Sequence, residues 1–155
     1  MKTEYINPFI EAAQAVFKTL LDTDTKLGRV YLKSSPFSVC DMVIMIGVVG
    51  EIRGQVSLEM TLETAKKIVS AMMGGIAVVD MDEIAASAVS ELGNMVMGNT
   101  CTIFSKNKIN IDITPPMILT GDKIKITNKV ATIVIPLILQ NYGNVNINVS
   151  AEEML

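Results

Sequence analysis

The hydrophobic positions change spacing several times along the chain, and each change predicts a new element. Residues 3–21 carry apolar side chains three or four positions apart, which is typical of an amphipathic helix. Residues 22–28 are polar and are expected to form a turn. Residues 29–35, 38–50 and 51–60 are expected to be strands.

The second half starts with two predicted helices. Thr61 is expected to cap a helix over residues 62–73, which Gly74 and Gly75 end. A longer helix is expected from Asp80 or Asp82 to about Ser105. Strands are expected over residues 109–114, 123–127, 130–136 and 144–150. The last of them alternates apolar residues with asparagine, so we expect an edge strand that either pairs with a second copy or faces solvent.

The two halves resemble each other when the chain is shifted by 80 residues. The shift matches six pairs: Glu11 with Glu91, Gln14 with Asn94, Val16 with Val96, Pro36 with Pro116, Ile44 with Ile124 and Ile46 with Ile126. We interpret this as a degenerate duplication of a helix–strand–strand unit. In that case the two long helices are related by a pseudo-twofold axis and pack on one shared sheet. The alternative is that any two such units can be slid into partial register.

Composition narrows the class of protein. The 155 residues are 50% hydrophobic and 19% charged, which favours one globular domain over residues 1–155. The net charge of −3 argues against nucleic-acid binding. No histidine occurs, so catalytic triads and metal sites that need imidazole are excluded. Cys40 and Cys101 are expected to be buried free thiols, and no metal site is expected.

Neither a signal peptide nor a membrane helix is expected. The N-terminal residues carry charges where a signal peptide needs an apolar core. The charge-free run over residues 130–151 contains Pro136 and several asparagines, so it does not suit a membrane. We therefore expect a soluble, cytoplasmic protein without membrane contact.

The long second-half helix carries the candidate chemistry. Glu91 and Asn94 are three residues apart and share a face, on which Ser87 lies one turn earlier. Gly93 and Gly98 weaken the helix and are expected to permit close approach of another backbone. A carboxamide can orient a water without ionising, as phosphoryl transfer to water requires. The alternative is that Glu91 and Asn94 belong to a solvated polar stripe.

A resemblance supports the chemical interpretation. The motif Ser87-x-x-x-Glu91-x-x-Asn94, followed by Pro116 after "DITP", resembles the signature of the CheC/CheX/FliY chemotaxis phosphatases. The match covers about residues 46–135 and is closest to the CheX branch. It implies an α/β (α+β) two-layer sandwich, with a mostly antiparallel sheet, two long helices on one face and a CheC-like pseudo-twofold duplication. Between Pro115 and Pro116, we choose Pro116 because it also matches Pro36 in the internal shift.

The resemblance also implies an activity, which is hydrolysis of the aspartyl phosphate on CheY, a response regulator. Glu91 matches the family acid that pairs with a lysine of CheY, and Asn94 matches the amide that orients the attacking water. Ser87, Gly93, Gly98 and Pro116 are then supporting or partner-contact residues. The chain needs no cofactor of its own, because the Mg²⁺ belongs to CheY. Relatives of the CheX branch are homodimers joined through sheet edges.

Two alternatives concern a second site in the first half of the chain and the class of protein. CheC relatives carry a second site in the first half, where this chain has Glu11 and Gln14, with Ala13 in place of the glycine. The resemblance to the single-site CheX branch makes this pair a degenerate second site or plain surface. The alternative to an enzyme is a noncatalytic module of the flagellar-switch type that binds partners without hydrolysing anything. An intact Glu-x-x-Asn motif favours the enzyme.

Overall fold

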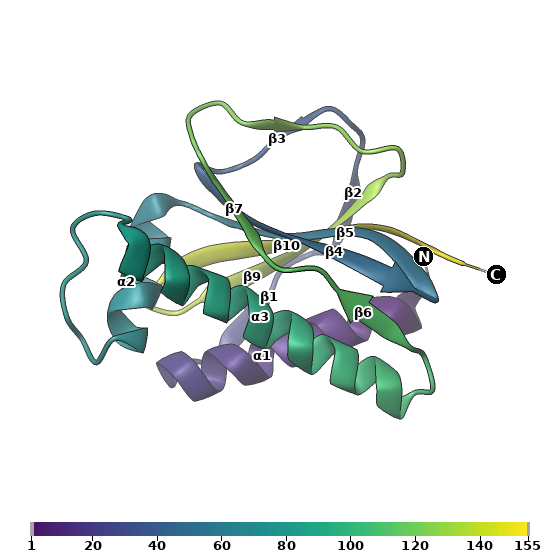
Figure 1. Cartoon of the computed structure of the whole chain (residues 1–155), viewed down its shortest axis with the longest axis horizontal. Helices are drawn as coiled ribbons and strands as arrows, with labels where there is room; N and C mark the ends of the chain where they lie inside the picture. Colours follow the sequence, from purple (N-terminus) through teal and green to yellow (C-terminus); the bar gives the residue numbers. More distant parts are fainter. Residues whose placement is uncertain (1, 155) are drawn as a thin grey trace.

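Two long helices lie side by side on one face of an antiparallel sheet (Figure 1). The computed structural model describes residues 2–154. Helix α1 spans Thr3–Leu21, α2 spans Leu62–Met72 and α3 spans Glu83–Lys106. All three agree with the predicted helices to within a residue or two. The expected α+β layering is therefore confirmed, with both long helices on the same face.

The main sheet has eight strands in the order β1-β9-β10-β5-β4-β6, with β2 also paired to β9 and β7 to β4. A separate two-stranded sheet joins β3 to β8. The strands are β1 Thr25–Leu27, β2 Tyr31–Lys33, β3 Phe37–Ser38, β4 Met42–Gly50, β5 Ile52–Met60, β6 Ile111–Ile113, β7 Met117–Thr120, β8 Lys125–Ile126, β9 Thr132–Leu139 and β10 Gly143–Glu153. Sequence patterns missed β1, β3 and β7, which are four residues or shorter.

The strand order confirms the internal duplication but corrects its register. Exchanging β1 with β6, β2 with β7, β9 with β4 and β10 with β5 maps the order onto itself. The offset of 80 holds for the starts of α1 and α3 but grows to about 90 for these long strands. The matching of Ile44 with Ile124 and of Ile46 with Ile126 was therefore wrong, because Ile124 and β8 lie outside the main sheet. Pro36 and Pro116 are not equivalent either, since they precede β3 and β7.

The main core fills the space between the sheet and the helices. On α1 the buried side chains recur at helical spacing, and Phe9 and Phe17 are fully buried. Phe9 meets Phe104 of α3 edge-on, with ring centroids 5.6 Å apart. Val145, Ile147 and Val149 of β10 point into the same core. Burial of these apolar faces, rather than helix propensity, holds both helices on the sheet.

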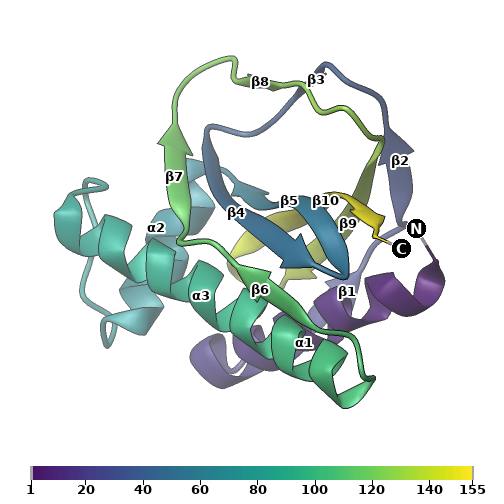
Figure 2. The same ribbon diagram turned by 45° about the vertical axis from the view of Figure 1, so that its right-hand side comes forward.

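The opposite face of the sheet is polar and covered. Residues 28–41 and 117–131, here called the arch, rise over it and meet where β3 pairs with β8 (Figure 2). The β10 residues Asn148 and Ser150 are only 3% and 5% exposed. The expectation of an edge strand over residues 144–150 was wrong, because β10 lies between β5 and β9 in the centre of the sheet. Asn148 is buried beneath the arch and Asn146 is partly buried there, whereas Asn144 is exposed.

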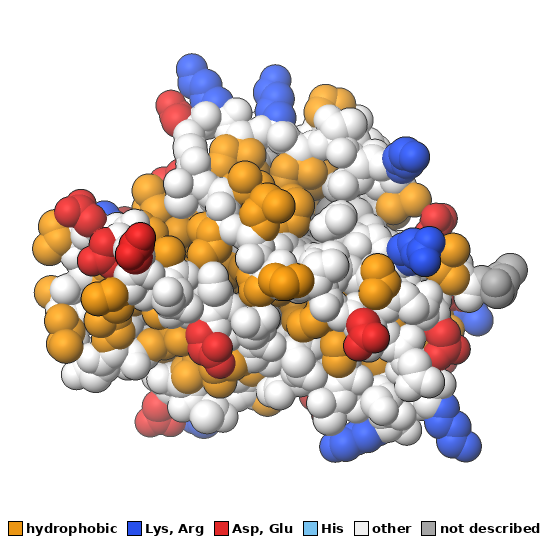
Figure 3. Space-filling view, in the orientation of Figure 1, with side chains coloured by type: hydrophobic (Ala, Val, Ile, Leu, Met, Phe, Trp, Pro, Cys, Tyr) orange, Lys and Arg blue, Asp and Glu red, His pale blue; other side chains and the backbone are white. Residues whose placement is uncertain are grey.

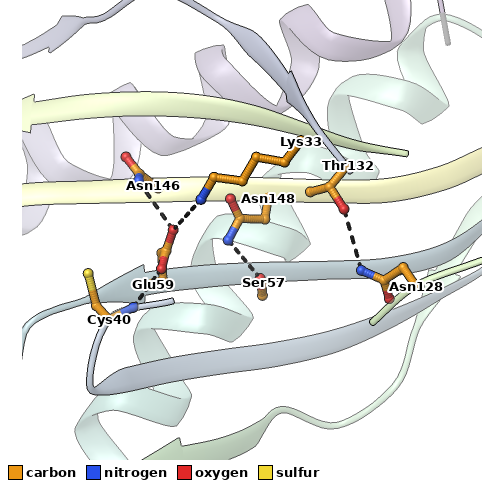
Figure 4. Close-up of polar contacts among 8 residues, drawn as sticks. All are labelled: Lys33, Cys40, Ser57, Glu59, Asn128, Thr132, Asn146 and Asn148. Carbon is orange, nitrogen blue, oxygen red and sulfur yellow. Dashed lines mark hydrogen bonds and ion pairs between the residues drawn. The ribbon is translucent and has the colours of Figure 1, made fainter. Parts of the chain in front are cut away.

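A buried carboxylate fastens the arch to the sheet. Glu59 of β5 is 3% exposed and accepts hydrogen bonds from the Cys40 backbone N–H at 2.8 Å and from Asn146 Nδ2 at 3.2 Å. Lys33 Nζ lies 3.8 Å from its Oε1 and 5.2 Å from the ring centroid of Phe37. Figure 4 shows Glu59 between Lys33, Cys40 and Asn146. A buried charge is tolerated only with such partners, so these contacts hold the arch in place.

Two smaller expectations concern the cysteines and a membrane-spanning helix. Cys40 and Cys101 are free but only partly buried, so their expected full burial was wrong. Among residues 2–154, none of the helices combines the length and the apolar character that crossing a membrane requires.

Candidate functional site

Helix α3 carries the candidate residues on its outer side. Asp82 caps the helix by accepting a hydrogen bond from the Ala85 backbone N–H at 2.9 Å. The inner face is buried at regular spacing, with Val89, Leu92 and Val96 each at most 1% exposed. The core therefore fixes the rotation of the helix about its axis. That rotation is what presents the outer face to solvent.

Glu91 and Asn94 both lie on this outer face and are exposed, as is Ser87. Their separation along the helix is about 4.5 Å, so one approaching group can meet both side chains. The ion pairs found among residues 2–154 do not involve Glu91. Its carboxylate is thus available to a cationic group from outside.

Gly93 brings α3 close to the sheet directly behind Asn94. A Cβ added at Gly93 would lie 2.8 Å from Cγ2 of Ile44 and 3.2 Å from Cδ1 of Ile46, both on β4. The glycine therefore makes room for sheet side chains, whereas the sequence had suggested another backbone. A Cβ at Gly98 would have no atom within 4 Å, so no segment of residues 2–154 approaches α3 closely at that position.

Pro116 lies beside the same point of α3. Its Cβ is 3.9 Å from a Cβ built at Gly93. The preceding residue pair is anchored through Thr114, whose hydroxyl accepts from the Gly47 N–H at 2.8 Å, while its own N–H donates to the Gly47 carbonyl at 2.9 Å. A Cβ at Gly47 would lie 2.9 Å from that hydroxyl oxygen, so only glycine permits this anchoring.

Thr114 and Gly47 anchor the segment that leads to Pro116, and sequence reasoning missed this contact. Both residues fell within expected strands. The run "DITPP" after the third helix indicates only that a strand ends there, because two prolines follow the threonine between β6 and β7. Nothing local in the sequence indicates that its hydroxyl meets a glycine on a distant strand.

The pair Glu11 and Gln14 lies on α1, away from Glu91 and Asn94. Glu11 is exposed and lines a shallow groove between α1 and the C-terminal half of α3, together with Asn99 and Lys106. Gln14 is partly buried, unlike the exposed Asn94. The structure therefore does not bring the two Glu-x-x-amide pairs together, and it presents their amides differently.

The remaining chemistry-bearing groups are poor catalysts. Burial raises the pKa of the Cys101 thiol, and the carboxylate of Asp112 raises it further. Burial likewise raises the pKa of Cys40, with further contributions from Glu59 and Asp41. Among residues 2–154, no three His, Cys, Asp or Glu side chains are grouped to hold a metal ion. The arrangement suits positioning of a water and pairing with a cation, rather than nucleophilic attack.

Comparison with known proteins agrees with this picture. The family model for the chemotaxis phosphatase CheX matches residues 42–137. The CheY-P phosphatase CheX of Thermotoga maritima is 34% identical over 126 residues, which is 81% of each chain. A crystal structure of the chemotaxis protein CheX from Desulfovibrio desulfuricans has a TM-score of 0.85 at 26% identity, covering 96% of this chain and 99% of that one.

A further solved structure contains a partner. The CheX–CheY–BeF₃–Mg²⁺ complex from Borrelia burgdorferi matches with a TM-score of 0.83 at 27% identity, over 98% of this chain and all of that one. The family model spans well over half of the chain, and the Thermotoga relative exceeds 30% identity over four fifths of it. The chain therefore belongs to the CheX family of chemotaxis phosphatases.

Proposed function

We propose that this chain is a cytoplasmic phosphatase, one domain over residues 1–155, that hydrolyses the aspartyl phosphate of a CheY-type receiver. One observation carries the proposal: a CheX-family chain presents an exposed carboxamide, Asn94, one turn from an exposed carboxylate, Glu91, on a close-packed helix. An exposed, rigid site suits a protein substrate whose own pocket holds the phosphate. The Thermotoga relative is a CheY-P phosphatase by name, which supports the same substrate.

In this proposal Asn94 enters the partner's phosphorylation site and orients the attacking water. Its carboxamide offers one acceptor and two donors in a plane, so it can hold a water in line with the phosphorus–oxygen bond. Glu91 pairs with a lysine of the receiver and fixes the approach. A magnesium ion, which we assign to the receiver, neutralises phosphoryl charge; the Borrelia relative was solved with CheY and Mg²⁺.

We assign the supporting residues separate tasks. Gly93, Pro116 and the Thr114 anchor hold α3 at a fixed height over β4, and this fixes where Asn94 projects. Ser87 extends the contact face by one turn. Gly98 leaves the same face free of a side chain, which lets the partner's backbone approach.

We treat Glu11 and Gln14 as the relic of a second site. Gln14 is partly buried, so its amide is less able to enter a partner's pocket than Asn94. The double variant Glu11→Ala/Gln14→Ala is expected to keep at least half of the wild-type phosphate release. A loss of tenfold or more would instead make this pair a working site.

We also propose that the chain forms a homodimer through the edge formed by β1 and β2. This edge exposes Leu27, Tyr31 and Leu32, at 40%, 42% and 69%. The opposite edge, formed by β6 and β7, adjoins the α3 site and would be crowded by a second copy. Sedimentation of Leu32→Lys beside the wild type tests this: a dimer that becomes a monomer supports the edge, and an unchanged dimer contradicts it.

Phosphate release from a phosphorylated CheY-type receiver of the same organism, measured with Mg²⁺, tests the enzymatic proposal. We expect the wild type to accelerate release, Asn94→Ala to lose roughly 100-fold or more, and Glu91→Ala to lose both turnover and affinity. Asn99→Ala is the matched control, because Asn99 is exposed on the same helix but points elsewhere. Full activity in Asn94→Ala contradicts the mechanism. Tight binding without turnover by the wild type favours a noncatalytic binding module.

A further inference from the structure

Large apolar side chains are exposed on both sides of the candidate site. Three lie at or just before the start of α3: Ile76, Val79 and Ile84 are 63%, 77% and 65% exposed. A fourth, Met117 at the start of β7, is 59% exposed. Figure 3 shows hydrophobic side chains gathered on this face, over the start of α3 and near β7. We call these four residues the apolar flanks.

The flank at the start of α3 is a shaped surface rather than a scatter of single residues. Ile76, Val79 and Ile84 line a groove of about 320 Å³ together with Met73. Asp80 and Asp82 line the same groove, so apolar and acidic side chains meet there. Grouped exposed apolar side chains with a polar rim are typical of protein contact sites, whereas a single exposed Ile needs no explanation.

One residue of each flank, Ile84 and Met117, is close enough to Glu91 and Asn94 to share one interface with them. Ile84 precedes Asn94 by about 15 Å along the helix and lies on the same side as Glu91, two turns later. Met117 follows Pro116, which packs next to Gly93. A standard interface covers about 800 Å² on each partner, a disc about 16 Å in radius. A disc centred on Asn94 therefore reaches Ile84 and Met117.

We infer that the apolar flanks are the docking surface for the phosphorylated receiver, and that they supply affinity while Asn94 and Glu91 act at the phosphate. This inference rests on the proposed function. The flanks adjoin the face that carries Asn94 and Glu91, and this identifies the partner that binds them. A receiver whose phosphoaspartate meets Asn94 must also cover the surface around Asn94. A second copy of the chain is placed elsewhere, at the β1–β2 edge, where other apolar side chains are exposed.

We expect changes in the flanks to weaken the affinity for the phosphorylated receiver and to leave the rate of the chemical step unchanged. The flank side chains do not reach the reacting atoms, so they bind ground state and transition state alike. The double variant Ile84→Ser/Met117→Ser should raise KM for the phosphorylated receiver about tenfold, or about 1.4 kcal/mol, with kcat within twofold of wild type. Both side chains are mostly exposed, so the thermal midpoint should shift little.

The experiment pairs turnover with direct binding. Phosphate release is measured against receiver concentration, and the affinity for the CheY-type receivers of the same organism, loaded with Mg²⁺ and BeF₃⁻, is measured by titration. Met154→Ser is the control, because Met154 is 41% exposed and follows β10, whose C-terminal end lies at the end of the molecule opposite α2 (Figure 1). A tenfold weaker affinity in the double variant alone supports the docking surface.

The outcomes separate this inference from the proposed function. Wild-type affinity and KM in the double variant overturn the docking surface while leaving the phosphatase intact. A fall in kcat at unchanged KM also overturns it. If the wild type binds the loaded receiver through the flanks but releases no phosphate, the docking surface stands and the phosphatase proposal fails. If the wild type neither binds nor hydrolyses, both are wrong.

Discussion

Replacing Gly93 by alanine should weaken the fold, although the same change at Gly98 should strengthen it. Each substitution removes the helix penalty of glycine, which is about 1 kcal/mol. At Gly98 nothing lies within 4 Å of the new Cβ, so that gain is kept. At Gly93 the Cβ would meet the Ile44 and Ile46 side chains at 2.8 and 3.2 Å, and both are fully buried.

Overpacking of this kind typically costs about 1–3 kcal/mol, because buried side chains have no empty space to enter. The net change at Gly93 is then a loss of about 0–2 kcal/mol, against a gain of about 1 kcal/mol at Gly98. For a chain of this length, 1 kcal/mol shifts the thermal midpoint by about 2–4 °C.

Urea and thermal unfolding of the two alanine variants beside the wild type give the comparison. We expect Gly98→Ala to unfold at a higher midpoint than the wild type and Gly93→Ala at the same or a lower one. Equal stabilisation by both would refute the close packing of α3 on β4 at Gly93. In that case the packing of α3 on β4 would not determine where Asn94 lies.

Two further predictions concern buried groups. Glu59→Ala removes the carboxylate that pairs with Lys33 and accepts from the Cys40 N–H, so it should lower the free energy of unfolding by about 2–4 kcal/mol, as measured with urea. Removing the exposed Glu63, which pairs with Lys67, should lower it by about 0.5 kcal/mol or less. Equal losses would contradict the buried anchor. The raised pKa values of Cys40 and Cys101 leave less thiolate at any given pH, so alkylation at neutral pH should be slower than for glutathione. Faster labelling would contradict the raised pKa.

The helices and the face that carries Glu91 and Asn94 could be predicted from the sequence because local interactions determine them. Asp82 and Thr61 cap helices where their side chains were expected to, since a cap needs only the next few backbone N–H groups. The spacing of Glu91 and Asn94 on an otherwise buried helix likewise places them on one face. The buried residues of α3, such as Val89, Leu92 and Val96, recur at helical spacing, which is the pattern that predicted this helix.

The position of β10 and the register of the duplication were beyond local reasoning. Residues 144–150 alternate as an edge strand would, but the arch covers their polar face and turns it into an interior. The anchoring of Thr114 on Gly47 joins residues 67 positions apart. Such contacts depend on tertiary structure, which propensity and periodicity do not encode.

The most direct test of the central claim compares binding with chemistry in Asn94→Ala. Single-turnover dephosphorylation at saturating phosphatase is measured beside affinity for the receiver loaded with Mg²⁺ and BeF₃⁻. If Asn94 orients the water, the rate should fall roughly 100-fold or more while affinity changes only a few fold. An unchanged rate, or a rate that falls only as far as affinity does, would contradict the account.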